Sequence, residues 1–134
     1  MPRSIVHHLF SWAAAAACLA PAVHAAEPAH LLAGYTAQAG RPASAEQGRA
    51  LFTSRHGREW SCASCHGEPP VQAGKHASTG KPIGALAPAS NAERFTDPAK
   101  TEKWFRRNCN DVMGRECSPG EKADVLAWLL TLKR

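Results

Sequence analysis

The chain has 134 residues, 16 of them basic and 11 acidic, which gives a formal net charge of +5. Its length suits one small domain with a single core. The modest positive excess does not indicate a nucleic-acid-binding protein, because such proteins carry a much stronger basic patch.

Residues 1–25 have the composition of a secretory signal peptide. Basic Arg3 is followed by an apolar run up to Ala22, which is too short for a membrane span, and by a small-x-small cleavage pattern that ends at Ala25. We expect cleavage after Ala25 or Ala26, export to the periplasm and a single mature domain over residues 26–134.

Two short helices are predicted in the first part of the mature chain, over residues 28–39 and 44–54. The second begins with a capping-box pattern at Ser44. Its Gly48 and Phe52 share one face. We expect this face to cross the last helix closely, at Trp128.

The motif Cys62-Ala63-Ser64-Cys65-His66 is typical of covalent haem attachment. On one helical turn the thiols of Cys62 and Cys65 reach the two vinyl groups of a haem, and His66 then coordinates the iron from the proximal side. The alternatives are a redox Cys-x-x-Cys pair and half of a zinc site. The secretory leader favours the haem, so one haem c with its iron is the expected cofactor.

After the motif, residues 67–91 are rich in proline and glycine and predict a long loop without strands. A helix is expected from the Asp97-Pro98 cap towards Arg107, and an amphipathic helix from a capping box at Ser118 to Lys133. The expected fold is all-α: a small cytochrome c-like domain of about four short helices wrapped around one covalently bound haem.

The cysteine count is even once the leader is removed. Cys18 lies in the leader, where the preceding alanines make a poor lipoprotein signal. In an oxidising compartment the two cysteines outside the haem motif, Cys109 and Cys117, are expected to form a disulfide. The alternative is a four-cysteine zinc site, which would leave His66 without a role.

The sixth coordination position of the iron separates an electron carrier from a gas-binding protein. Met113 lies 47 positions after His66 and is the type of ligand that an electron carrier uses. By residue type alone, Asn108 fits a helix C-cap. A bis-histidine site could use one of three other histidines, although their surroundings fit exposed side chains: His30, His56 and His76.

Several longer segments are more specific than the haem motif. They are AGY (33–35), GRALF (48–52), SCASCHG (61–67), LAP (86–88), RFTD (94–97) and, most specific of all, EKWFRRNCNDVMGREC (102–117) with PGEKADVLAWL (119–129). On these segments the chain resembles, from Pro28 to Leu132, the sphaeroides haem protein family of oxygen-binding, high-spin cytochromes c.

The resemblance implies that Asn108 is the distal iron ligand and that Cys109 and Cys117 form a disulfide. It also implies a monomer that binds O2, NO or CO when reduced, with oxygen-dependent removal of nitric oxide as a dioxygenase-like activity. A di-haem cytochrome c and a membrane cytochrome b would supply electrons. Met113 departs from the family, in which an aliphatic residue can stand there. It leaves open a plain electron carrier with His66/Met113 ligation.

An asparagine amide has the chemistry that such a role needs. Its carbonyl oxygen is neutral and weak-field, so it satisfies ferric iron but binds the softer ferrous iron poorly. The freed amide N–H can then donate a hydrogen bond to a gas. The sequence contains no acid–base pair from which a catalytic residue could be proposed. A gas sensor without turnover is a third hypothesis, beside the gas-binding cytochrome and the plain electron carrier.

The helix before Asn108 is also basic. We expect its four cations to help dock a redox partner, although a solvated helix face explains them equally well: Lys100, Lys103, Arg106 and Arg107.

Overall fold

The computed structural model describes residues 28–134; the predicted leader, its cleavage site and Cys18 lie outside them. The elements in chain order are α1 (Pro28–Ala39), α2 (Ala45–Thr53), α3 (Cys62–His66), β1 (Gly74–Lys75), β2 (Pro82–Ile83), α4 (Pro98–Met113) and α5 (Pro119–Thr131). None of the helices within 28–134 has the length and apolar character needed to cross a bilayer. The predicted all-α cytochrome c-like fold is confirmed, with α3 formed by the haem motif itself.

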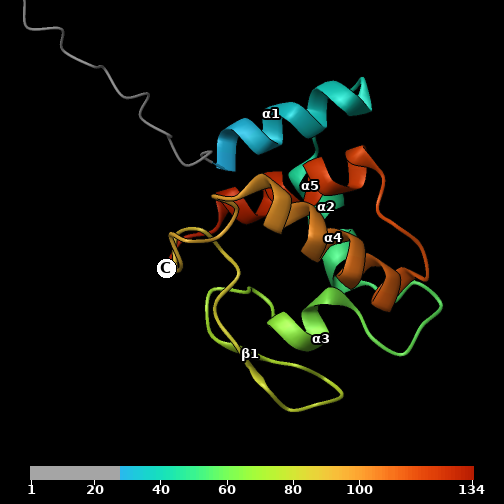
Figure 1. Cartoon of the computed structure of the whole chain (residues 1–134), viewed down its shortest axis with the longest axis vertical. Coiled ribbons are helices and arrows are strands. Elements are labelled where there is room, and N and C mark those ends of the chain that lie inside the picture. The colour runs from blue at the N-terminus through green and yellow to red at the C-terminus, as the bar shows by residue number, and fades with distance from the viewer. Residues whose placement is uncertain (1–27) are drawn as a thin grey trace, which may run out of the picture.

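Helices α2 and α5 cross at the centre of the molecule, and α1 packs on the other side of α5 (Figure 1). The crossing is close because Gly48 has no side chain: a Cβ at this position would fall on the backbone carbonyl of Asp124. One helical turn later, the Phe52 ring lies 5.0 Å from the Trp128 ring, measured between centroids. The predicted contact between these two helices is therefore present, and it forms one of two core clusters.

The helix starts follow their predicted caps. The Ser44 side chain accepts a hydrogen bond from the Gln47 amide, and Asp97 accepts one from the Lys100 amide at 3.0 Å. At α5, Ser118 and Glu121 form the complete capping box. Each of these starts depends on only a few neighbouring residues, which is why the sequence predicts it.

The end of α4 differs from the prediction. The helix continues beyond Arg107 to Met113 and ends at Gly114, whose φ of 71° is the left-handed conformation that suits glycine. Asn108 therefore lies inside the helix, and its interpretation as a C-cap is wrong.

The segment after α3 contains two very short strands that were not predicted. Gly74 pairs with Ile83 and Lys75 with Pro82 in an antiparallel hairpin. Strands of two residues are too short to show an alternating pattern, and a proline in one of them argues against a strand. A Cβ on Gly74 would fall on the carbonyl of Cys65, so the hairpin lies directly against the haem motif.

Candidate haem site

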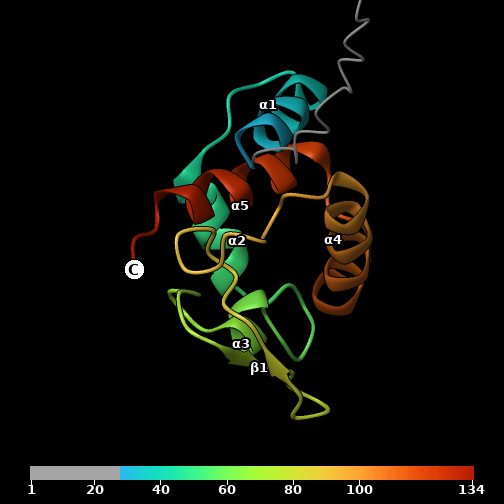
Figure 2. The same cartoon turned by 60° about the vertical axis from the view of Figure 1, so that its left-hand side comes forward.

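A cavity of about 770 Å³ opens between the haem motif, the loop after it and α4. Figure 2 shows α3 and α4 standing apart, and residues of both helices line this cavity. Its inner end is apolar, with side chains such as Leu51, Val125 and Leu129 from α2 and α5. The size and the apolar lining are those of a site for a large organic cofactor.

Cys62 and Cys65 both face this cavity and are free thiols. Burial raises the pKa of the Cys62 thiol to about 11, with a smaller contribution from Cys65. A redox-active Cys-x-x-Cys pair needs the opposite shift, because the thiolate is its nucleophile. The raised pKa of Cys62 therefore disfavours a redox role for this thiol.

His66 presents a neutral imidazole to the same cavity. Burial, and then the positive charge of Arg94, lower its pKa to about 4. Its Nδ1 atom is buried and has no hydrogen-bond partner among the described residues. A neutral imidazole is the form that coordinates a metal. Within residues 28–134, no three or more His, Cys, Asp or Glu side chains are grouped so that they could hold a metal ion.

Asn108, on α4, lines the cavity. Its side-chain amide makes no hydrogen bond with any other described residue. The neighbouring Asn110 differs, since its amide donates to the Arg106 carbonyl at 2.8 Å. Met113 is not part of the lining, and its sulfur lies 3.6 Å from the Cys117 sulfur. Five residues of an α-helix correspond to a rotation of about 140°, so Asn108 and Met113 cannot face the same point.

The sulfur atoms of Cys109 and Cys117 are joined in a disulfide. Both cysteines line the cavity next to Asn108 and Val112. The bridge ties the last turns of α4 to the residue before the α5 cap. It therefore holds the part of α4 that carries Asn108.

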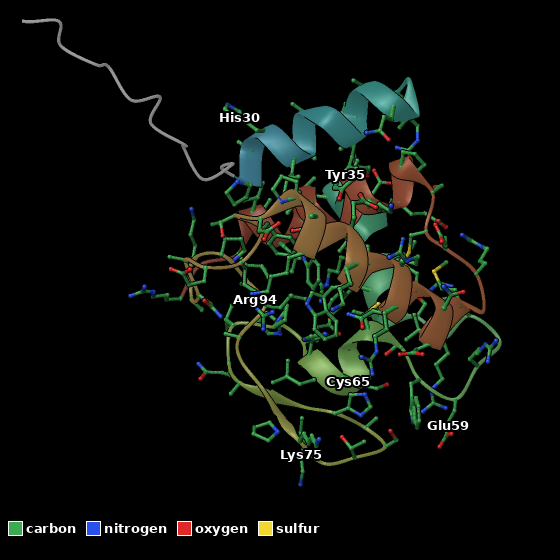
Figure 3. The ribbon with its side chains drawn as sticks, viewed as in Figure 1. His30, Tyr35, Glu59, Cys65, Lys75 and Arg94 are labelled. Carbon is green, nitrogen blue, oxygen red and sulfur yellow. A yellow bond between two sulfur atoms is a disulfide. The ribbon has the colours of Figure 1, made fainter. Side chains whose placement is uncertain are left out.

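The three other candidate histidines lie in different places. Figure 3 shows His30 on α1, away from Cys65. His56 lies outside the lining, with Nε2 2.8 Å from the Leu51 carbonyl. His76 is at the cavity, but its hairpin is bonded to the haem motif through the Ala77 amide and the Cys65 sulfur at 3.3 Å. This bond places the residue after His76 against Cys65 of the haem motif.

Sequence reasoning missed two side chains of this site. Arg94, labelled in Figure 3, reaches the cavity from the loop before α4, and Trp104 is 42% exposed on α4 at the cavity mouth. The RFTD segment contains Arg94, but nothing local in the sequence indicates that its guanidinium turns inward.

The residues present fit a covalently attached haem. Two free thiols and a neutral imidazole line one wall, the inner end is apolar, and α4 carries an amide without a hydrogen-bond partner among the described residues. Each group has the chemistry that haem attachment or axial coordination requires.

Comparisons with known proteins show which family the chain resembles. The family model "Domain of unknown function (DUF1924)" matches residues 38–129. The chain is 57% identical over 106 residues to the cytochrome c-type protein SHP of Cereibacter sphaeroides, covering 76% of this chain and 81% of that protein. It also resembles the structure of oxidised SHP, described as an oxygen-binding cytochrome c, with a TM-score of 0.75, 55% identity, and coverage of 79% of this chain and 97% of that one.

A more distant relative is cytochrome c'' of Methylophilus methylotrophus, whose solution structure addresses haem-ligand detachment. The TM-score is 0.69 at 39% identity, covering 80% of this chain and 94% of the other. The family model and the SHP relative extend over most of the described residues, the haem motif and α4 included. The chain belongs to the sphaeroides haem protein family of c-type cytochromes, and its cofactor is one haem c with its iron.

Proposed function

We propose that this cytochrome works in the periplasm and binds the diatomic gases O2, NO or CO when it is reduced. Cys62 and Cys65 attach the haem through thioether bonds, His66 is the proximal ligand and Asn108 is the distal ligand of the oxidised protein. The oxygen binding named for the SHP relative supports this function, and the predicted leader supports the location.

The observation that carries the proposal is the different placement of Asn108 and Met113. Asn108 lines the cavity, and its amide has no competing hydrogen bond among the described residues, whereas Met113 is not in the lining and contacts the Cys117 sulfur. An electron carrier needs a strong distal ligand in both redox states. An amide oxygen is a weak ligand, and it is weakest towards ferrous iron.

The haem supplies an iron that changes between ferric and ferrous states and accepts a gas at its sixth position. Asn108 is the residue that would hold the iron in the oxidised protein and would release it on reduction. Its amide N–H then donates a hydrogen bond towards the gas. Oxygen-dependent removal of nitric oxide belongs to the same proposal, because O2 held at the position that Asn108 vacates would combine with NO to give nitrate, with one electron supplied by the ferrous iron.

The disulfide limits how far Asn108 moves. In the chain-entropy model, closing a loop of this length stabilises the fold by about 2–3 kcal/mol. It also fixes the backbone of α4 directly after Asn108, so only the side chain is free to swing.

Electrons are proposed to arrive through the exposed face of α4. Lys100, Lys103, Arg106 and Arg107 are all exposed there. The Arg107 guanidinium lies 5.5 Å from the centroid of the Trp104 ring, and both side chains line the cavity mouth. A partner with acidic side chains around an apolar spot fits this face, and we propose a di-haem cytochrome c that a membrane cytochrome b reduces.

The test compares Asn108→Ala with Met113→Leu by optical spectroscopy of the oxidised and reduced protein, with and without carbon monoxide. The wild type should be high-spin when ferric, lack the sulfur-to-iron charge-transfer band, and bind carbon monoxide rapidly when ferrous. Asn108→Ala should change the ferric spectrum and the lifetime of the oxygenated form, while Met113→Leu should change little.

A low-spin ferrous spectrum that does not respond to carbon monoxide, and that is lost in Met113→Leu, would contradict the proposal. The protein would then be a plain electron carrier with His66/Met113 ligation. Consumption of nitric oxide by the oxygenated protein, followed with an electrode, tests the removal activity separately.

A further inference from the structure

Arg94 is a partly buried cation for which the described residues provide no anion. Its Nε donates to the Ala85 carbonyl at 2.9 Å, and its Nη2 donates to the Gly84 carbonyl at 2.6 Å. Within residues 28–134, no carboxylate lies close enough to form an ion pair with it. Burial also lowers the pKa of this guanidinium. A partly buried cation without a counter-charge is costly, so an anion at this place would stabilise it.

The backbone next to Arg94 is held in an unfavourable conformation. Phe95 has a φ of 62°, which costs a bulky residue about 1–3 kcal/mol. This turn directs the Phe95 ring into the core, where its centroid lies 6.4 Å from that of Phe105. The preceding Arg94 is then left at the cavity wall. Such strain persists where the surrounding structure fixes a side chain for function.

The loop that receives Arg94 is itself fixed. The Asn91 side chain donates to the same Ala85 carbonyl at 3.2 Å, and the Leu86 and Ala87 amides both donate to the Pro70 carbonyl. The carbonyls that bind the guanidinium therefore have a defined position. Two of the three guanidinium nitrogens are held by them, and Nη1 has no partner among the described residues.

The other charged residues of the cavity are exposed at its mouth and can be solvated there: Lys81, Glu93, Asp97, Lys100, Arg107 and Asp111. A counter-charge for Arg94 inside the cavity can therefore be supplied by the cofactor. The anionic groups that a haem carries at its periphery are its two propionate carboxylates. The planar guanidinium fork is the side chain best suited to such a carboxylate.

We infer that Arg94 binds one haem propionate inside the cavity and thereby sets the position and the reduction potential of the haem. This inference rests on the haem site and not on the proposed gas binding. Thioether bonds to Cys62 and Cys65 attach the haem covalently, so variants of Arg94 should remain loaded.

The experiment compares Arg94→Gln, Arg94→Lys and the control Arg107→Gln, which removes the same charge from an exposed position at the cavity mouth. All are purified as holoproteins, and their covalent haem content is measured first. Resonance Raman spectroscopy follows the propionate bending band, and spectroelectrochemistry at pH 8 follows the reduction potential, because a carboxylate stays ionised there.

Arg94→Gln should shift the propionate band and lower the potential more than Arg107→Gln does, because an unpaired propionate favours ferric iron. Arg94→Lys should keep the reduction potential close to the wild-type value, because the positive charge is retained. The propionate band should still shift, because an ammonium group cannot form the paired hydrogen bonds of a guanidinium. An unshifted band in Arg94→Gln, or an equal fall in potential in both glutamine variants, would overturn the inference. Carbon monoxide binding by the same samples tests the gas proposal independently.

Discussion

Glu121 is a single residue that stabilises the start of α5 through three hydrogen bonds. It accepts from both terminal nitrogens of Arg115, at 2.7 and 2.8 Å, and from the Ser118 amide at 2.7 Å. The bonds from Arg115 are the main reason why its pKa falls from 4.5 to about 2. The folded protein therefore holds this carboxylate ionised in a pH range where the unfolded chain takes up a proton.

We predict that Glu121→Gln lowers the free energy of unfolding by about 1 kcal/mol at pH 7. The carboxylate contributes fully above its unfolded pKa, and the contribution is lost as pH falls from 4.5 towards about 2. The difference between variant and wild type should therefore shrink over this range. Urea unfolding at pH 7 and at low pH measures it. Glu59→Gln, at an exposed loop residue without an ion pair in the described region, is the control.

At the scale of elements, the crossing of α2 and α5 is fixed by close packing and by one ion pair. The Asp124 carboxylate, on α5, accepts from Arg41 at 2.6 and 3.1 Å and from the Ser44 amide at 2.7 Å. Burial alone would raise the pKa of Asp124, but these bonds outweigh it and lower the pKa. The same carboxylate therefore holds the start of α2 against α5, next to Gly48.

We predict that Gly48→Ala destabilises the fold by about 1–3 kcal/mol, because its Cβ would push the two helix backbones apart. Gly34→Ala is the matched control: it lies in α1 with no atom near its added Cβ. The control should stabilise the fold by about 0.5–1 kcal/mol, since alanine favours the helix. Thermal unfolding of the two holoproteins measures both changes in stability. A loss of stability of similar size in both variants would refute the packing argument.

These elements also show what the sequence can predict. The caps at Ser44, Asp97 and Ser118 and the haem motif are local patterns, and each lies where it was expected. The end of α4 was missed because its Asn and Asp residues favour loops as readily as helices. Once the helix extends to Gly114, the separation of Asn108 from Met113 follows from helix geometry alone. The environment of Arg94 could not be predicted, because distant carbonyls and the positive φ of Phe95 create it.

At the scale of the whole molecule, the basic face of α4 and the chain end lie on opposite sides. Figure 2 shows α4 on one side of the molecule and the C-terminus on the other. Lys133 and Arg134 near that end are exposed, as are Lys100 and Lys103 on α4. The two pairs carry the same charge but differ in their relation to the cavity mouth. They therefore separate local docking from the effect of net charge.

We predict that reversing Lys100 and Lys103 to Glu slows reduction by an acidic di-haem cytochrome c about tenfold or more at low ionic strength. Electrostatic steering changes association rates by this order, and salt screens it. Stopped-flow mixing over a range of salt concentrations measures the rate.

The double variant should lose most of the salt dependence, whereas reversing Lys133 and Arg134 should leave it nearly intact. Trp104→Ala should slow the reaction even at high salt, because it removes the apolar contact beside Arg107. Equal slowing by both charge pairs would mean that net charge, and not the face of α4, controls the encounter.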